Sequence, residues 1–131
     1  WEDTTHVPFI VSYPKTIAKN SICESPVSFI DIYPTLVDLA GIPKKEGLDG
    51  KSLKELLVNP SMEWNRPVLS TYGKGNHAVR SGKWRYIEYR DGSSELYNHQ
   101  NDPNEWCNLS DKEDSQEIVK RLKKVIPVKE K

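Results

Sequence analysis

The sequence predicts an α+β fold, in which a carboxy-terminal four-stranded antiparallel sheet with a packed helix follows a strand-helix piece of a larger α/β domain. Two observations predict it. Apolar residues recur at helical period before residue 60 and near the carboxy-terminal end, and at a period of two in the part between. Residues 59–67 hold two prolines and mark a joint. We therefore divide the chain into residues 1–60 and 61–131.

The first predicted element is a strand within residues 6–14, HVPFIVSYP. This apolar run is too short for a helix and is rich in β-formers. It lacks the alternation of a half-exposed strand, which is typical of a strand covered on both faces of a parallel sheet. The chain offers no sheet for this strand to join. We therefore expect that part of the molecule is missing from this sequence.

A helix is predicted to follow between Asp31 and Ala40. Its apolar residues share one face at helical spacing: Phe29, Ile30, Tyr33, Leu36, Val37 and Ala40. Ser28 and Asp31 are spaced as a capping box. If Asp31 is the N-cap, Pro34 falls in the first turn, where its missing N–H costs little; otherwise the helix is kinked at Pro34. Gly41 is placed to end the helix in a left-handed conformation.

A brief helix over 53–58, capped by Ser52, precedes the joint. Beyond it the pattern predicts four strands: Val68–Tyr72, His77–Arg80, Trp84–Arg90 and Glu95–Asn98. The pairs Ser81-Gly82 and Asp91-Gly92 supply turn residues. On the third strand, Trp84, Tyr86 and Glu88 share one face, and Arg85, Ile87 and Tyr89 the other.

A last helix is predicted after a capping box at Ser110 and Glu113, and Pro127 is expected to end it. Its apolar stripe is Ile118, Val119, Leu122, Val125 and Ile126. An antiparallel meander with this helix packed across it buries the apolar residues of both most simply.

Composition excludes several classes of partner. Lys+Arg and Asp+Glu both number 19 in the 131 residues, so the net charge is zero and no nucleic-acid partner is expected. The longest apolar runs are too short for a membrane span. Cys23 and Cys107 match no metal spacing; they either pair in an oxidising compartment or remain thiols.

Four segments together resemble the carboxy-terminal part of sulfatases of the alkaline-phosphatase-like superfamily. They are WEDTTHVP at 1–8, DIYPTLVDLAGIP at 31–43, LDGKSL at 48–53 and the L-Y-x-x-x-x-D-P-x-E-x-x-N-L pattern at 96–109. The Thr-His-Val-Pro stretch, the segment 77–80 and Trp106 resemble the iduronate-2-sulfatase-like branch. The resemblance implies a small α+β subdomain at 61–131 and, at 1–60, the end of an α/β catalytic domain.

The resemblance also implies a chemistry. Sulfatases hydrolyse sulfate esters with a formylglycine, made from the Cys or Ser of C/S-x-P-x-R, beside a Ca²⁺ held by Asp and Asn side chains. The segment Cys23-Glu24-Ser25-Pro26-Val27 does not fit that motif, and the family's calcium ligands lie upstream of the part that this chain resembles. We therefore expect no catalytic residue and no metal ligand in this chain, and a carboxy-terminal fragment that is inactive alone.

Two residues are candidates for substrate contact. His77 and Arg80 lie on one predicted strand, and an imidazole and a guanidinium could bind sugar hydroxyls, carboxylate or sulfate. Three positions apart, they point to opposite faces of the strand, so a structural role competes with substrate contact for each. His6 could line the site, although a structural hydrogen bond is favoured for it, and His99 is expected to be a cap or a solvated side chain.

Asp102 and Glu105 could form a carboxylate pair, but a turn explains Asp before Pro better. The aromatic residues could form a sugar platform, although burial in the core or a domain interface is favoured: Trp84, Tyr86, Tyr89 and Trp106.

The expected partners are the remainder of the sulfatase catalytic domain and, for the parent enzyme, a sulfated carbohydrate. The alternative function is a non-catalytic glycan- or protein-binding module. Localisation follows from the resemblance alone, which implies a secreted, periplasmic or lysosomal parent.

Overall fold

The computed structural model describes residues 1–14, 16–17 and 19–127. It contains two compact units, which we call the sheet unit (Trp1–Val7 with Asn65–Lys131) and the helical unit (Pro8–Trp64). The sequence placed residues 1–7 with the rest of 1–60, whereas these residues pack with the sheet. The assignment of 1–60 to a catalytic domain stays a prediction.

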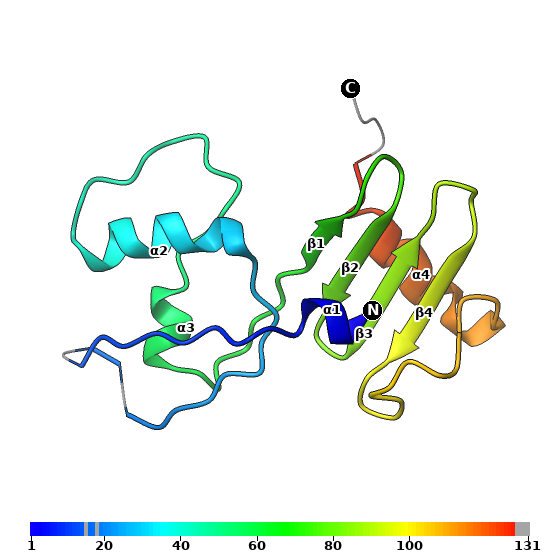
Figure 1. Ribbon diagram of the computed structural model, residues 1–131, viewed down its shortest axis with the longest axis horizontal. Coiled ribbons are helices and arrows are strands. Elements are labelled where there is room, and N and C mark those ends of the chain that lie inside the picture. The colour runs from blue at the N-terminus through cyan, green and yellow to red at the C-terminus, as the bar shows by residue number, and fades with distance from the viewer. Residues whose placement is uncertain (15, 18, 128–131) are drawn as a thin grey trace. The chain divides into compact units, whose positions relative to one another are not determined.

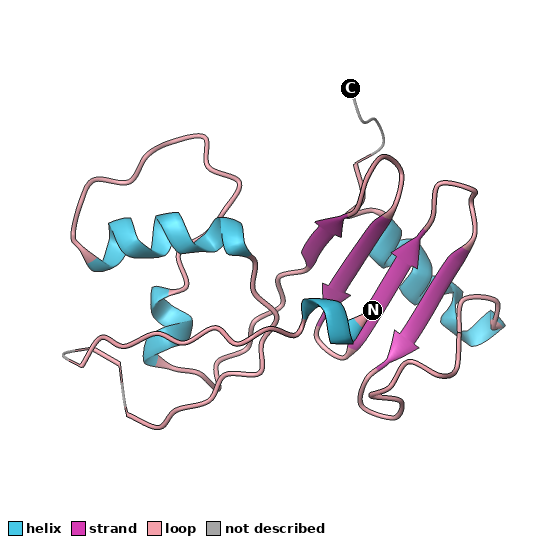
Figure 2. Cartoon of the chain, viewed as in Figure 1, coloured by secondary structure: helices cyan, strands magenta, loops and turns pink. Residues whose placement is uncertain are grey.

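The sheet unit contains the predicted antiparallel meander. Its strands are β1 (Val68–Thr71), β2 (His77–Ser81), β3 (Trp84–Glu88) and β4 (Ser94–Asn98), in the order β1-β2-β3-β4 (Figures 1 and 2). Gly82 and Gly92 adopt left-handed conformations, with φ of 51° and 87°, in the turns between the later strands. The α+β fold and the order of the strands are confirmed.

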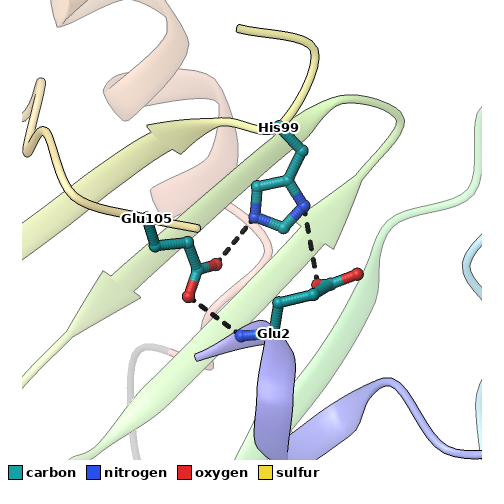
Figure 3. A group of neighbouring side chains, drawn as sticks. All are labelled: Glu2, His99 and Glu105. Carbon is teal, nitrogen blue, oxygen red and sulfur yellow. Dashed lines mark hydrogen bonds and ion pairs between the residues drawn. The ribbon is translucent and has the colours of Figure 1, made fainter. Parts of the chain in front are cut away.

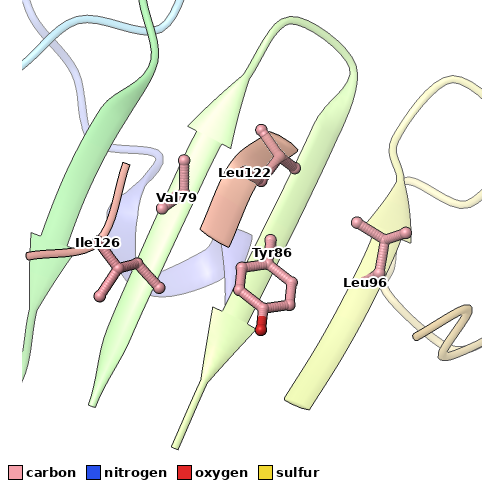
Figure 4. Close-up of a cluster of buried hydrophobic side chains, with 5 residues drawn as sticks. All are labelled: Val79, Tyr86, Leu96, Leu122 and Ile126. Atoms are coloured by element: carbon pink, nitrogen blue, oxygen red, sulfur yellow. The ribbon is translucent and has the colours of Figure 1, made fainter. Parts of the chain in front are cut away.

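One face of the sheet carries the hydrophobic core. The helix α4 (Gln116–Lys123) crosses this face, preceded by the 3₁₀ turn η2 (Glu113–Ser115) (Figure 1). The buried core residues are Val79, Tyr86, Leu96, Leu122 and Ile126 (Figure 4). Because side chains alternate along a strand, the neighbours of these strand residues point to the opposite face.

The predicted capping box at Ser110 is wrong. The Ser110 hydroxyl donates to the Ser94 carbonyl at 2.9 Å, and the Ser110 carbonyl accepts a bond of 2.7 Å from the side-chain Nε2 of Gln116. The hydroxyl therefore ties the loop to β4, and the helical turns begin at Glu113. An unpredicted short helix, α1 (Glu2–Thr5), lies over the other face of the sheet (Figure 1).

The helical unit is organised by Asp31. The 3₁₀ turn η1 (Phe29–Asp31) leads into α2 (Ile32–Leu39), and a capping box joins Ser28 to Asp31 as predicted. The Asp31 carboxylate also accepts a bond of 2.9 Å from the Lys51 amide. Pro34 lies in the first turn of α2, so the helix needs no kink.

The loop before α3 (Lys54–Val58) runs against η1. A Cβ on Gly50 would lie 2.0 Å from the Ile30 carbonyl oxygen, so this close approach requires glycine. The Thr35 hydroxyl then accepts a bond of 2.8 Å from the Leu53 amide. Asp31 and Thr35 therefore fix the loop to α2 through backbone donors.

The predicted buried strand within 6–14 is wrong. No described residue of this segment is in a strand, and Phe9 and Ile10 are 42% and 89% exposed. A strand needs a neighbouring strand for its backbone hydrogen bonds, and the described strands all belong to the sheet at 68–98.

No helix among the described residues is long and apolar enough to cross a membrane.

Candidate functional site

The sheet face opposite α4 carries a buried group of charged side chains. Arg80 of β2 and Arg85 of β3 are paired across the strands, an arrangement that is destabilising without a counter-charge. The Glu2 carboxylate of α1 supplies it: Oε2 forms an ion pair with Arg85 Nη2 and lies 3.3 Å from Arg80 Nε. The Arg85 side chain is only 2% exposed, whereas those of Arg80 and Glu2 are 20% and 24% exposed, so the pairing is partly shielded from water.

A second carboxylate completes the group. Glu105 Oε1 lies 2.8 Å from Arg85 Nε. The same oxygen lies 2.7 Å from His99 Nε2, while Oε2 accepts a bond of 2.9 Å from the Glu2 amide (Figure 3). His99 Nδ1 lies 3.5 Å from Glu2 Oε2. The contact at Arg85 Nε is electrostatic, since this N–H makes no hydrogen bond in the described part of the chain. We call Glu2, Arg80, Arg85, His99 and Glu105 the ion cluster.

The ion cluster changes the acidity of Glu2. Burial disfavours its charged form, but the hydrogen bond from Arg85 and the charge of Arg80 outweigh this effect. The pKa of the Glu2 carboxyl therefore lies below its ordinary value of 4.5. The site keeps Glu2 as an anion, which suits a fixed counter-charge rather than a proton donor.

A tight loop positions Glu105. Asp102 Oδ1 accepts a bond of 3.1 Å from the Trp106 amide, and Oδ2 accepts one of 2.9 Å from the Cys107 amide. Glu105 itself is left-handed, with φ of 58°, which costs energy in a residue other than glycine. The prediction of a turn here is confirmed, and the turn also directs the Glu105 carboxylate inward.

The ion cluster does not fit a metal ion. Glu2, His99 and Glu105 each offer a ligand atom within 4.8 Å of the others. However, Arg85 already pairs with both carboxylates, and a divalent cation would have to share them with a buried guanidinium. Ca²⁺ moreover prefers six to eight oxygen ligands. The group is better described as a salt-bridge network centred on Arg85.

The structure separates the two predicted substrate-binding residues, as their spacing implied. His77 is buried, and its Nδ1 lies 2.9 Å from the Thr71 hydroxyl on the neighbouring strand. Arg80 points to the other face, where it contacts Glu2 and donates to the Gly82 carbonyl. Both have structural partners, and their contact with substrate stays a prediction.

Two other histidines are placed differently from each other. The His6 side chain is 81% exposed and lies 4.0 Å from Glu2 Oε1. His99 was expected to be a cap or solvated, which is wrong: its side chain is 9% exposed and lies between Glu2 and Glu105. The expectation failed because nothing in the local sequence indicates that a segment near residue 2 covers this turn.

The aromatic residues do not form one platform. Tyr86 belongs to the core, and Trp84 packs against it, as the favoured prediction had it. Trp106 is 82% exposed, so its predicted burial is not found in this structure. Cys23 and Cys107 are both free and exposed.

Comparison with known proteins gives a consistent result. The family described as N-sulphoglucosamine sulphohydrolase, C-terminal, matches residues 1–131. A sulfatase from Formosa agariphila is 34% identical over 127 residues, which cover 97% of this chain and 25% of that protein. Arylsulfatase K of Mus musculus is 37% identical over 125 residues, covering 84% of this chain and 22% of that protein. The chain thus spans about a quarter of the length of these relatives.

Solved structures show the same fold. BT4656, determined in complex with its substrate D-glucosamine-2-N,6-O-disulfate, matches 86% of this chain and 26% of its own, with a TM-score of 0.73 at 23% identity. BT1596, a 2-O GAG sulfatase, matches 72% of this chain and 22% of its own, with a TM-score of 0.59 at 28% identity. None of these comparisons tests the iduronate-2-sulfatase-like branch, which stays a prediction.

Proposed function

Because the chain belongs to the sulfatase family and matches its carboxy-terminal domain over residues 1–131, we propose that it is the carboxy-terminal region of a sulfatase acting on sulfated sugars. In this proposal the chain supports the fold and the flank of the substrate cleft. The parent enzyme hydrolyses sulfate esters, and the rest of the catalytic domain supplies the reacting groups.

The observation that carries this proposal is the match of the whole chain to a carboxy-terminal domain, combined with the content of its polar site. The ion cluster holds two carboxylates, but both are engaged by Arg85. A general base or nucleophile must be available to the reacting atoms. The cluster therefore supports a structural role for this polar site.

By the same reasoning we expect the cofactors to be held outside this chain. Neither the segment around Cys23 nor the ion cluster fits a formylglycine precursor or a calcium site, so no step is assigned to these groups here. In the parent enzyme we expect both to come from the catalytic domain. Chelation of calcium is accordingly expected to leave the folding of this chain unchanged.

The substrate class rests on the relatives. BT1596 is a 2-O GAG sulfatase, and it shares 28% identity with this chain. Sulfated sugars are anionic, so basic side chains are suited to bind them. We retain His77 and Arg80 as the candidate contacts. Arg80 is the better suited of the two to bind an anion, because its guanidinium has N–H donors beyond the one that faces Glu2.

A chimera tests the proposal. The quarter of the Formosa agariphila sulfatase that matches this chain is replaced by residues 1–131, and hydrolysis of an aryl sulfate is compared among the chimera, the unmodified enzyme and the isolated chain. We expect turnover by the chimera and none by the isolated chain, with or without calcium.

Two results would contradict the proposal. Turnover by the purified chain would show that it carries its own chemistry. A folded chimera that hydrolyses no sulfate ester would favour the alternative, a non-catalytic glycan- or protein-binding module.

A further inference from the structure

The helix α2, together with the turn η1 before it and Ala40 after it, exposes a continuous row of apolar residues, although its Val37 is buried. Phe29, Tyr33 and Leu36 are 72%, 53% and 61% exposed, and Ala40 is exposed as well. These four residues are spaced 4, 3 and 4 positions apart, so they form one continuous apolar face. We call them the outer stripe.

Polar residues occupy the opposite, inward face of the helix. Asp31 is 0% exposed and Thr35 is 4% exposed. Both are used by the neighbouring loop, since they accept the backbone amides of Lys51 and Leu53 at 2.9 and 2.8 Å. These bonds fix the rotation of the helix about its axis, so the outer stripe cannot turn inward without breaking them.

The composition of the outer stripe is that of an interface core. Two of its members are aromatic and none is charged, which matches the depletion of charge and enrichment of aromatic residues at the centre of protein interfaces. Asp38, the charged residue of α2, lies outside the outer stripe, and its Oδ1 is 3.3 Å from Lys54 Nζ. A water-exposed helix face would be expected to carry such charges itself.

A second segment of the helical unit has the same property. Phe9 and Ile10 are exposed although the sequence predicts a buried strand there. Two segments of one unit thus expose apolar side chains to water. The relatives are about four times as long as this chain, so about three quarters of their length is available to cover both segments.

We propose that the outer stripe of α2 is the docking surface for the α/β catalytic part of the sulfatase, which covers it with an apolar face. This inference rests on the proposed function and adds to it the surface by which the chain is attached. Apolar cover of this kind is the main source of free energy at a permanent interface.

Cysteine labelling tests the docking surface directly. In a Cys23→Ser, Cys107→Ser background, Leu36→Cys reports on the outer stripe, and Glu46→Cys, in an exposed loop of the same unit, serves as the matched control. The rate of maleimide labelling at each site is followed by peptide mapping in the isolated chain and in the Formosa agariphila chimera.

We expect both cysteines to react fast in the isolated chain. In the chimera, labelling of Leu36→Cys should slow at least about tenfold, because it then requires a local opening, and Glu46→Cys should change less than about twofold. If the chimera does not fold, the Formosa agariphila enzyme itself is used, with cysteine introduced at the residue aligned with Leu36.

Three results overturn the inference. Unslowed labelling of Leu36→Cys in an active chimera refutes the docking surface while the proposed function stands. Protection already in the isolated chain that grows with concentration assigns the stripe to a second copy. Protection there that is independent of concentration assigns it to the chain itself. Conversely, an inactive chimera with Leu36→Cys protected keeps the docking surface and counts against the proposed function.

Discussion

Replacement of Arg85 by methionine is the sharpest test of the ion cluster. The variant keeps most of the length of the side chain and removes only its charge and donors. It leaves the Glu2 and Glu105 carboxylates facing each other without the cation between them. We therefore expect a loss of stability that arises from electrostatics rather than from a cavity.

The structure sets the size of this loss. Removing one partner of a buried ion pair costs about 3–5 kcal/mol. The Glu105 side chain is 4% exposed, whereas Glu2 is 24% exposed and can recover some hydration, so we take the lower end of this range. For a unit of roughly 70 residues, about 3 kcal/mol lowers the midpoint of thermal unfolding by at least ~12 °C.

Thermal and urea unfolding of the full chain, followed by tryptophan fluorescence, measures the effect. Arg121→Met, on the exposed face of α4, is the matched control and should stay within about 0.5 kcal/mol of the wild type. The double variant Arg85→Met/Glu105→Gln should recover about 1 kcal/mol, because one stranded charge is removed as well. A single variant that loses less than about 1 kcal/mol, or a double variant less stable than the single one, would refute the reasoning.

Three further perturbations test other parts of the molecule. Leu96→Ala, in the core at 0% exposure, should destabilise the sheet unit by about 2–5 kcal/mol in urea unfolding, whereas Leu48→Ala at 38% exposure should cost far less; equal effects would contradict the assigned core. Burial and the neighbouring Glu88 raise the pKa of Tyr86 to about 12, so its contribution to stability is complete below pH 10 and is lost as the pH rises toward 12. Tyr86→Phe should therefore reduce the alkaline decline of the unfolding midpoint, and an unchanged decline would argue against this coupling. Asp31→Ala should speed hydrogen exchange at the Ser28 and Lys51 amides, which donate to the Asp31 carboxylate, and lower the free energy of unfolding by about 1–3 kcal/mol. Unchanged exchange at these two amides would contradict the role of Asp31.

The elements that the sequence predicts well are those whose signals are local. The strands of the meander follow from alternation and from Gly82 and Gly92, because a turn and a period of two need no distant partner. The capping box at Ser28 and the first-turn position of Pro34 are local in the same way. These features could be predicted because the deciding residues lie within a few positions of one another.

What the sequence does not predict depends on distant partners. The ion cluster joins Glu2 to Arg85 over 83 positions, and no local pattern pairs them. The only available signal is that β3 places an arginine beside hydrophobic residues on a strand, which demands a counter-charge from somewhere. The prediction of a strand within 6–14 is wrong for a related reason, because its apolar pattern requires a neighbouring sheet, and the described part of this chain offers none to that segment.

The sheet unit is assembled from two stretches of chain that are separated by the whole helical unit. This arrangement imposes an order on folding. The segment that carries Glu2 comes before its partner Arg85 by 83 positions in the chain. Closing a flexible loop of that length costs about 4 kcal/mol of chain entropy, beyond a constant term. Residues 65–131 hold the sheet and its core, so we expect them to form before α1 docks. The ion pairs of Glu2 with Arg80, Arg85 and His99 are then the last part of the ion cluster to form, and they report that α1 has docked on the sheet.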